Sequence, residues 1–376
     1  MTGIASLRWV GSDRRKIAGA AAEMLLREAL AHRPDDAGLR LRLAGLMFDR
    51  SDFATVAAIL VPDVAAGALQ ALELAGRAAL AAGDLGAAIR LLDGPAHAGQ
   101  VRALSAMAQA MAGREGLVAA MPWVERTLAT APADPIAFNL LAKSLFAAGA
   151  PERVDALCAD LELRGVATAQ TSAIRAVARH RMRNEAGANA LFDVEAIAVR
   201  ELDHADNAAL AEEILSHANL VPAHPAHATA GGLRVDDPET ADSPALLRLI
   251  DRVRCAVEAY GAGRIGWNGQ MLSGDVRLDI WAVVLSGAAH EEWHVHPSGA
   301  VSGVYYVAVP AVGADAGALQ FGLLPFPPEG ACPMPALTLT PRPGNLMLFP
   351  SSFAHRTLPT HSEEPRISIA FDVVPL

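Results

Sequence analysis

Aromatic residues make up only 5% of this 376-residue chain, although 52% of its residues are hydrophobic. Alanine supplies much of the hydrophobic share, so closely packed helices are expected in at least part of the molecule. No run of 18 apolar residues occurs, and this excludes an ordinary membrane-spanning helix. The start, MTGIASLRWVGSDRRK, lacks a basic segment followed by an apolar one, so we expect no secretory signal.

Cysteine is scarce as well, and basic charge is in deficit. The three cysteines, Cys158, Cys255 and Cys332, are scattered and form no CxxC spacing. Neither a disulfide framework nor a zinc finger is therefore expected, and a reducing, cytoplasmic location fits best. The net charge of -10 argues against a nucleic-acid partner, which would require a basic face. The sequence carries no signal for an oligomeric state.

Residues 1–220 have helical composition throughout and contain turn signals at roughly regular intervals. The turns are centred on Ser51, Gly83, Gly113 and Gly149. A small residue lies seven positions before each centre: Ala44, Gly76, Ala106 and Ala142. This pattern resembles the tetratricopeptide repeat, a helical hairpin with a period near 34 residues. A generic helical bundle is the alternative, because an alanine-rich chain places small residues at such positions by chance.

The periodicity changes after the segment VPAHPAHATAGG. We expect a linker over 221–241, in which His224 and His227 are solvated. A capped amphipathic helix is predicted over 242–263, and it opens a third segment, 242–376. From about residue 266, short runs alternate with a period of two, as in VRLDIWAVVL and RISIAFDVVP. The predicted fold is multidomain α + β: an α-solenoid followed by a double-stranded β-helix, or jelly roll.

Three histidines occupy seven positions in HEEWHVH, and two of them, His294 and His296, alternate at the end of a predicted strand. Alternate residues of a strand face one side, so both imidazoles are expected to reach one metal ion. FPSSFAH supplies a third histidine, His355, just after the strand NLMLFP. Arg366 follows eleven residues later, within the last predicted strand.

These motifs together, HxHPxGxxSGVYYV, GALQFG, PGNLMLFPSSFAHRT and PRISIAFDVVP, resemble the 2-oxoglutarate- and Fe(II)-dependent oxygenases, in the bacterial branch fused to tetratricopeptide repeats. The resemblance covers residues 266–376. It implies that His294, His296 and His355 hold Fe(II), and that Arg366 binds the far carboxylate of 2-oxoglutarate while Ser368 assists. It also implies that O2 is a cosubstrate.

One departure from the family pattern concerns the metal ligands, because His296 stands where the family has a carboxylate. Three interpretations stay open: a site of three histidines, recruitment of Glu291 or Glu292, or an outer position for His296. A closed structural zinc site lacks an obvious fourth ligand. His290 is expected beside the site, where it would be solvated, support a metal ligand or contact the substrate.

Several further residues are candidates for the surroundings of the site. Tyr305 and Tyr306 face opposite sides of a strand, so one of them is expected beside the cosubstrate. Trp281, Arg277 and Gln270 are expected near the site or its mouth.

The predicted function is a 2-oxoglutarate-dependent dioxygenase, an oxidoreductase that hydroxylates a peptide or protein side chain bound partly by the repeats. One alternative is a three-histidine non-haem oxygenase or cupin-like enzyme that does not use 2-oxoglutarate. Another is a non-catalytic repeat scaffold.

Overall fold

The computed structural model describes residues 7–10, 19–236, 238, 243–261, 274–311, 313, 315–326 and 335–376. The chain divides into two compact units, which we call the repeat unit (17–150 with 224–226) and the sheet unit (1–16, 151–223 and 227–376). Cys332 and Gln270, both named above, lie outside the described residues. None of the described helices is long and apolar enough to cross a membrane.

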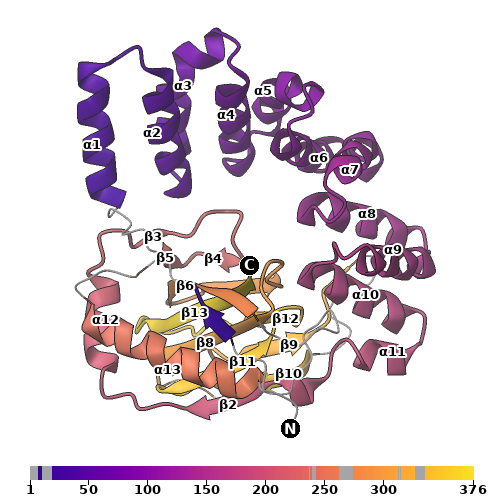
Figure 1. The fold of residues 1–376 in the computed structure, drawn as a ribbon, viewed down its shortest axis with the longest axis vertical. Coiled ribbons are helices and arrows are strands. Elements are labelled where there is room, and N and C mark those ends of the chain that lie inside the picture. The colour runs from indigo at the N-terminus through magenta and orange to yellow at the C-terminus, as the bar shows by residue number, and fades with distance from the viewer. Residues whose placement is uncertain are drawn as a thin grey trace. The chain divides into compact units, whose positions relative to one another are not determined.

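The repeat unit consists of consecutive helical hairpins (Figure 1). Its helices are α1 (Gly19–His32), α2 (Ala37–Asp49), α3 (Phe53–Ala65), α4 (Leu69–Ala81), α5 (Leu85–His97), α6 (Val101–Glu115), α7 (Leu117–Thr130) and α8 (Pro135–Ala147). Four of them begin at an aspartate that accepts a hydrogen bond from the backbone N–H three residues later: Asp36, Asp52, Asp84 and Asp134. These caps satisfy N–H groups that a helix leaves unpaired, so each helix has a defined start.

The turns between hairpin helices fall at left-handed residues, three of them as predicted. Ser51, Gly83 and Gly149 have φ angles of 61°, 83° and 70°. The prediction of a turn centred on Gly113 is wrong, because α6 continues through this residue and ends only at Glu115. The left-handed residue is Gly116, with φ 91°. A left-handed backbone favours glycine, which has no Cβ to clash with the carbonyl that follows.

The small residues before these turns are buried where helices cross. Ala44, Ala106 and Ala142 are at most 5% exposed. At Gly76 in α4, an added Cβ would lie 2.7 Å from Leu92 Cγ of α5. These contacts explain the small residues that suggested a repeat, because helices approach this closely only over small side chains.

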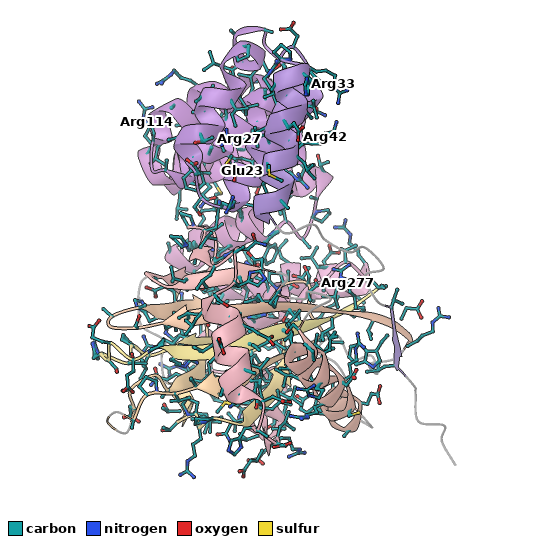
Figure 2. The ribbon with its side chains drawn as sticks, turned by 90° about the vertical axis from the view of Figure 1, so that its left-hand side faces the viewer. Glu23, Arg27, Arg33, Arg42, Arg114 and Arg277 are labelled. Atoms are coloured by element: carbon teal, nitrogen blue, oxygen red, sulfur yellow. The ribbon has the colours of Figure 1, made fainter. Side chains whose placement is uncertain are left out.

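Two further contacts stabilise the repeat unit. Glu23 of α1 pairs with Arg27 at 2.9 Å and accepts a hydrogen bond from Arg50, which follows α2 (Figure 2). His224 is 8% exposed, and its ring packs against Phe48 and Phe53, with centroids 4.8 and 5.3 Å apart. The prediction that His224 is solvated is therefore wrong, because this part of the linker packs against the helices.

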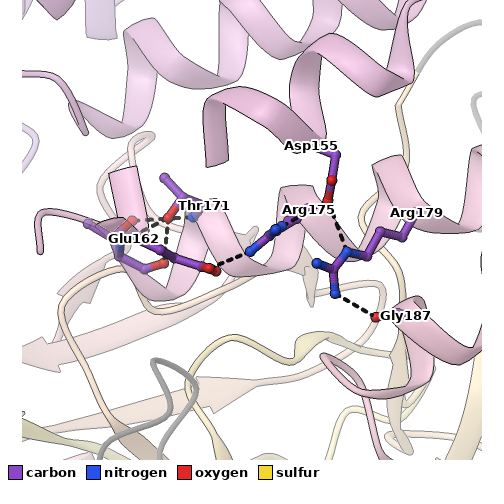
Figure 3. Close-up of polar contacts among 7 residues, drawn as sticks. Asp155, Glu162, Thr171, Arg175, Arg179 and Gly187 are labelled. Atoms are coloured by element: carbon purple, nitrogen blue, oxygen red, sulfur yellow. Dashed lines mark hydrogen bonds and ion pairs between the residues drawn. The ribbon is translucent and has the colours of Figure 1, made fainter. Parts of the chain in front are cut away.

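The part of the sheet unit that follows the repeat unit in the chain begins with three helices within the segment 1–220: α9 (Pro151–Leu163), α10 (Ala169–Arg181) and α11 (Glu185–Asn189). A network of charges connects them (Figure 3). Asp155 accepts hydrogen bonds from Arg175 and Arg179 at 2.8 and 2.9 Å. Arg175 also pairs with Glu162, and Arg179 donates to the carbonyl of Gly187. Shared partners fix these side chains more cheaply than isolated pairs would, since each ordered group serves two contacts.

Two sheets form the rest of the unit. The larger has the order β2 (Ala198–Glu201), β11 (Asn345–Pro350), β8 (Val301–Ala308), β13 (Arg366–Pro375), β6 (Gly274–Leu285), β5 (Leu233–Asp236) and β3 (Val221–Pro222), with β1 (Leu7–Trp9) also paired to β6. The smaller has the order β10 (Pro335–Leu339), β9 (Leu319–Gly322), β12 (Ala354–Thr357), β7 (His290–His294) and β4 (Thr229–Ala230). The predicted jelly roll is confirmed as two layered sheets with no helix among the described residues after 274.

The two faces of the larger sheet bury different clusters. One face packs against α13 (Pro244–Gly261) and α12 (Asn207–Leu215) through Tyr305, Ile369 and Phe371. The other face meets the smaller sheet through Val304, Tyr306 and Phe321, among others. Because side chains alternate along a strand, each strand of the larger sheet serves both clusters. Helix α13 matches the amphipathic helix predicted over 242–263.

The crossing of α4 and α5 gives a test of the repeat packing. We expect Gly76→Ala to lower the free energy of unfolding by about 1–3 kcal/mol, because its Cβ would overlap Leu92. The control is Gly45→Ala, since nothing lies within 4 Å of a Cβ there. That substitution should raise stability by up to about 1 kcal/mol through helix propensity. Urea unfolding measures both, and equal shifts would contradict this packing.

Candidate metal centre

Two neighbouring strands of the smaller sheet carry histidines. His294 on β7 is paired with His355 on β12. The register then shifts, because Glu291 lies opposite Thr357, so three steps on β7 match two on β12. An extra residue of this kind changes which side chains face inward. In a regular strand, Glu291 and His294 would face opposite sides of the sheet. Because the register shifts between them, both side chains can lie on the same side.

The three predicted histidines come together. One ring nitrogen from each of His294, His296 and His355 can be chosen so that all three lie within 4.8 Å of one another. The ring centroids are 4.2 Å apart for His294 and His355, 5.1 Å for His294 and His296, and 5.0 Å for His296 and His355. Imidazole groups this close repel one another when protonated, so the cluster suits a cation that all three rings share.

The hydrogen bonds of the three rings determine which nitrogens are available. Nδ1 of His294 lies 2.7 Å from the carbonyl of Glu292, and Nδ1 of His355 lies 2.9 Å from the carbonyl of Phe353. Nδ1 of His296 lies 2.6 Å from Asp372 Oδ1. Each of these partners is an acceptor, so each Nδ1 carries the proton. Nε2 is then the nitrogen on each ring that could bind a metal, which is the arrangement common to metal-binding histidines.

The surroundings shift the pKa values of the three imidazoles in two directions. Burial, followed by the neighbouring rings of His294 and His296, holds the pKa of His355 well below its usual value. Burial likewise lowers the pKa of His294. Burial opposes charge on His296 too, but the adjacent carboxylate of Asp372 outweighs it and raises the pKa of His296. In the metal-free protein, two rings therefore stay neutral and ready to bind a cation.

Arg366 is a buried cation in the same interior. It is 1% exposed, and its guanidinium carbon lies 4.8 Å from the centroid of the Tyr306 ring. Among the described residues, no hydrogen-bond partner meets its Nε and Nη1 atoms. Leaving such nitrogens unpaired in the interior is costly, so the site suits an anion that accepts from them. A dicarboxylate held by a metal at one end fits these donors.

The tyrosine pair separates as predicted. Tyr306 faces the interior beside Arg366 and is fully buried. Tyr305 faces the opposite side, where its hydroxyl donates to Asn207 Oδ1 at 2.7 Å and its ring joins the cluster under α13. Tyr306 is thus the member that faces the same interior as Arg366. Ser368, two residues after Arg366 on β13, lies on the same face and is 3% exposed.

The other predicted residues lie at different distances from the three histidines. The Trp281 ring is 5.5 Å from the His296 ring, and Arg234 covers Trp281 with its guanidinium carbon 4.7 Å from the ring centroid. Arg277 pairs with Asp279 at 2.5 Å, two residues before Trp281 on β6 (Figure 2). Trp281, Asp279 and Arg277 occupy every second position of β6, so their side chains lie on one face of the strand. Trp281 is beside His296, and the other two lie nearer the start of β6.

His290 turns away from the three histidines. Its Nε2 lies 3.0 Å from Glu292, and its Nδ1 lies 3.0 Å from the carbonyl of Ala288. Those two contacts, the carbonyl first, raise the pKa of His290. Glu292 is exposed and engaged with His290, whereas Glu291 accepts a hydrogen bond from Thr229 at 3.1 Å. Neither glutamate belongs to the cluster of three ligand atoms.

Sequence reasoning missed Asp372 and Arg234. Asp372 stands in RISIAFDVVP at an even spacing from Arg366, so strand alternation places both on the interior face. That alternation was the available signal. Arg234 lies on β5, within the segment interpreted as a linker, and nothing in the sequence indicated its contact with Trp281.

Comparison with known proteins defines the class of this region. Residues 279–372 match the family model described as "Putative 2OG-Fe(II) oxygenase". This part of the chain is therefore similar to the 2-oxoglutarate- and Fe(II)-dependent oxygenases, a class of oxidoreductases, and it carries three histidines that could hold a metal ion. No curated protein matches the chain.

Solved structures with some likeness fall into two groups. A Pseudomonas putida prolyl-4-hydroxylase is 18% identical with a TM-score of 0.36, and the match covers 50% of this chain and 97% of that one. HygX from Streptomyces hygroscopicus, with nickel and 2-oxoglutarate bound, is 16% identical with a TM-score of 0.37, covering 50% and 85%. YrrB, a tetratricopeptide repeat protein with an unusual peptide-binding site, is 16% identical with a TM-score of 0.35, covering 43% and 86%.

The depressed pKa of His355 predicts a pH dependence. Unfolded histidine takes up a proton near pH 6.5, whereas folded His355 takes it up only at lower pH. Below pH 6.5 the unfolded state therefore binds more protons, and the folded state loses stability. Between pH 7.5 and 5.5, we expect the stability advantage of the metal-free wild type over His355→Asn to shrink by about 1 kcal/mol. Urea unfolding with a chelator present measures it, and a constant or growing advantage would contradict it.

Proposed function

We propose that the protein binds Fe(II) through His294, His296 and His355 and binds 2-oxoglutarate through Arg366, and that it hydroxylates a side chain of a peptide or protein. The observation that carries this proposal is the buried, incompletely paired Arg366 in the same interior as the three imidazoles. A metal site alone would not require a second, buried cation. A dicarboxylate cosubstrate requires both.

The residues of the chain have separate tasks in this scheme. His294, His296 and His355 would hold Fe(II) through neutral imidazoles, and a set of three protein ligands would leave coordination positions for the cosubstrate and O2. Bound Fe(II) supplies the oxidation, in which O2, 2-oxoglutarate and a C–H bond yield succinate, CO2 and an alcohol. Arg366 grips the far carboxylate, and Ser368 and Tyr306 line its pocket with hydroxyl groups. Phe321 and Phe349 pack beside His355 and keep water from this end of the interior.

The proposed class of substrate is supported by the architecture. Consecutive helical hairpins give an extended surface, which suits a chain-like ligand better than a small molecule. Trp281 and Arg234 beside His296 supply an aromatic face and a cation near the three histidines. Both groups suit the backbone and polar side chains of a peptide.

Binding of the cosubstrate gives a direct test. We expect anaerobic Fe(II) and 2-oxoglutarate to produce the weak visible charge-transfer band of a chelated keto acid. Arg366→Ala should raise the Kd for 2-oxoglutarate about tenfold to a hundredfold, because charge-assisted hydrogen bonds are lost. The matched control is Arg356→Ala, since Arg356 pairs with Gln320 and lies over Trp293. That variant should leave the Kd unchanged.

The same titration separates the rival functions. An iron-loaded wild type without the band would favour a three-histidine enzyme that does not use 2-oxoglutarate. A protein that binds neither iron nor keto acid would favour a non-catalytic scaffold. The band should weaken in His296→Ala, and its full survival there would show that His296 is not a ligand.

The substrate class needs its own measurement. With Fe(II), 2-oxoglutarate and O2, we expect members of a peptide library to gain one oxygen atom, with an equal yield of succinate. His355→Ala serves as the inactive control. Oxidation of free amino acids or other small molecules, with no peptide modified, would contradict a peptide substrate while leaving the cofactor assignment intact.

A further inference from the structure

We propose that Asp372 is a positioning residue for the metal and that it fixes the orientation of the His296 ring. Through its hydrogen bond to that ring, Asp372 also supplies the negative charge of the carboxylate ligand that His296 replaces. This inference rests on the proposed function, because it concerns the metal that His296 would hold. It assigns a role to a residue at the edge of the site that the sequence motifs did not single out.

The carboxylate of Asp372 is largely buried and accepts two hydrogen bonds. Its Oδ1 lies 2.6 Å from Nδ1 of His296, and the two side chains are 15% and 10% exposed. Ser302 donates to the same oxygen at 2.6 Å, and the Ser302 hydroxyl also lies 2.7 Å from that of Ser351. A buried carboxylate is stable only when hydrogen bonds or opposite charge compensate it, and here His296 and Ser302 both supply hydrogen bonds.

The ring of His296 needs such support more than its two partners do. His294 and His355 lie on the paired strands β7 and β12. His296 lies beyond the end of β7, where its backbone N–H donates to the Ser351 carbonyl at 3.2 Å. Asp372 comes from β13, which pairs with β6 on one side and β8 on the other. The carboxylate therefore connects a loop histidine to a strand that is paired on both sides.

The loop after His296 approaches the hydrogen-bonded side chains of Ser351 and Asp372 closely at Gly299. A Cβ at Gly299 would clash with Ser351 Oγ and would come within 3.3 Å of the Asp372 carboxyl carbon. Only a residue without a side chain fits there. The close approach keeps water away from the bond between His296 and Asp372, and a drier bond is electrostatically stronger.

Two other carboxylates lie nearby, and their contacts differ. Glu291 is hydrogen-bonded to Thr229, and Glu292 to His290. Asp372 is bonded directly to a ring of the three-histidine cluster. A carboxylate that accepts the Nδ1 proton makes Nε2 a stronger donor and partly transfers its charge to the metal. In this way a three-histidine site gains anionic character without a carboxylate in contact with the metal.

Metal affinity tests the proposal without relying on turnover. We expect Asp372→Asn to weaken Fe(II) binding about 10- to 100-fold in anaerobic calorimetry. The matched control is Asp279→Asn, because Asp279 is the cross-strand partner of Asp372 but pairs with Arg277. We expect that control to bind Fe(II) as the wild type does. Asp372→Glu keeps the charge and should recover part of the lost affinity.

A spectroscopic readout separates charge from packing. Loss of the anionic partner makes the iron less electron-rich, so the Fe(II)-to-keto-acid band of Asp372→Asn should move to shorter wavelength. Ser302→Ala removes a neighbour of Asp372 but retains its charge, and its band should stay near the wild-type position. A purely structural role for Asp372 would weaken binding without moving the band.

The outcomes distinguish this inference from the proposed function. Wild-type affinity and band position in Asp372→Asn would overturn the role of Asp372 and leave the oxygenase proposal standing. A larger loss in Glu291→Gln than in Asp372→Asn would assign the charge to Glu291 instead. Absence of the band in iron-loaded wild type would refute the proposed function itself, whatever the variants show.

Discussion

The pairing of β13 with a strand on each side is the constraint on which the sheet unit depends. Residues Ile367–Val373 bond to β6 on one side and β8 on the other, so the strand cannot slip without breaking both ladders. Its alternate residues put Arg366, Ser368 and Asp372 into the interior, while Ile369 and Phe371 pack beneath α13. A slip of one residue would bury a charged face against that helix and strip the site of its cation.

The helices α9–α11 support the site from outside the sheets. The N–H of Ala169, at the start of α10, donates to the carbonyl of Pro297, directly after His296. Phe192 packs on Phe353 with centroids 4.6 Å apart, and the Phe353 carbonyl accepts from His355. His296 and His355 thus lie next to residues that the segment 151–192 contacts: Pro297 through a backbone hydrogen bond, and Phe353 through its ring. The charge network of Asp155 keeps α9 and α10 together, so it contributes indirectly to the placement of two imidazoles.

Much of this could be predicted from the sequence, because strand alternation and helical turn signals are local. The grouping of the three histidines, the opposite facing of the tyrosine pair and the turn residues Ser51, Gly83 and Gly149 followed from spacing, whereas Arg366 came from the resemblance to the oxygenase family. Gly113 misled because a glycine inside a helix and one that ends it look alike, and only the left-handed backbone of Gly116 distinguishes them. The contacts of Asp372 and Arg234 were not predicted, because they arise from pairing between strands that are distant in the sequence. His224 escaped because the burial of a linker residue depends on the surface it meets.

The all-nitrogen donor set has a consequence for metal supply. Neutral imidazoles favour copper and zinc over ferrous iron, in keeping with the general order of stabilities for divalent metals. A carboxylate ligand would shift this preference only slightly, and none stands among the three ligand atoms. Three imidazole donors would therefore not select iron by affinity, and metal availability would decide which ion the site holds. The metal recovered with the purified protein will reflect the growth medium and the host.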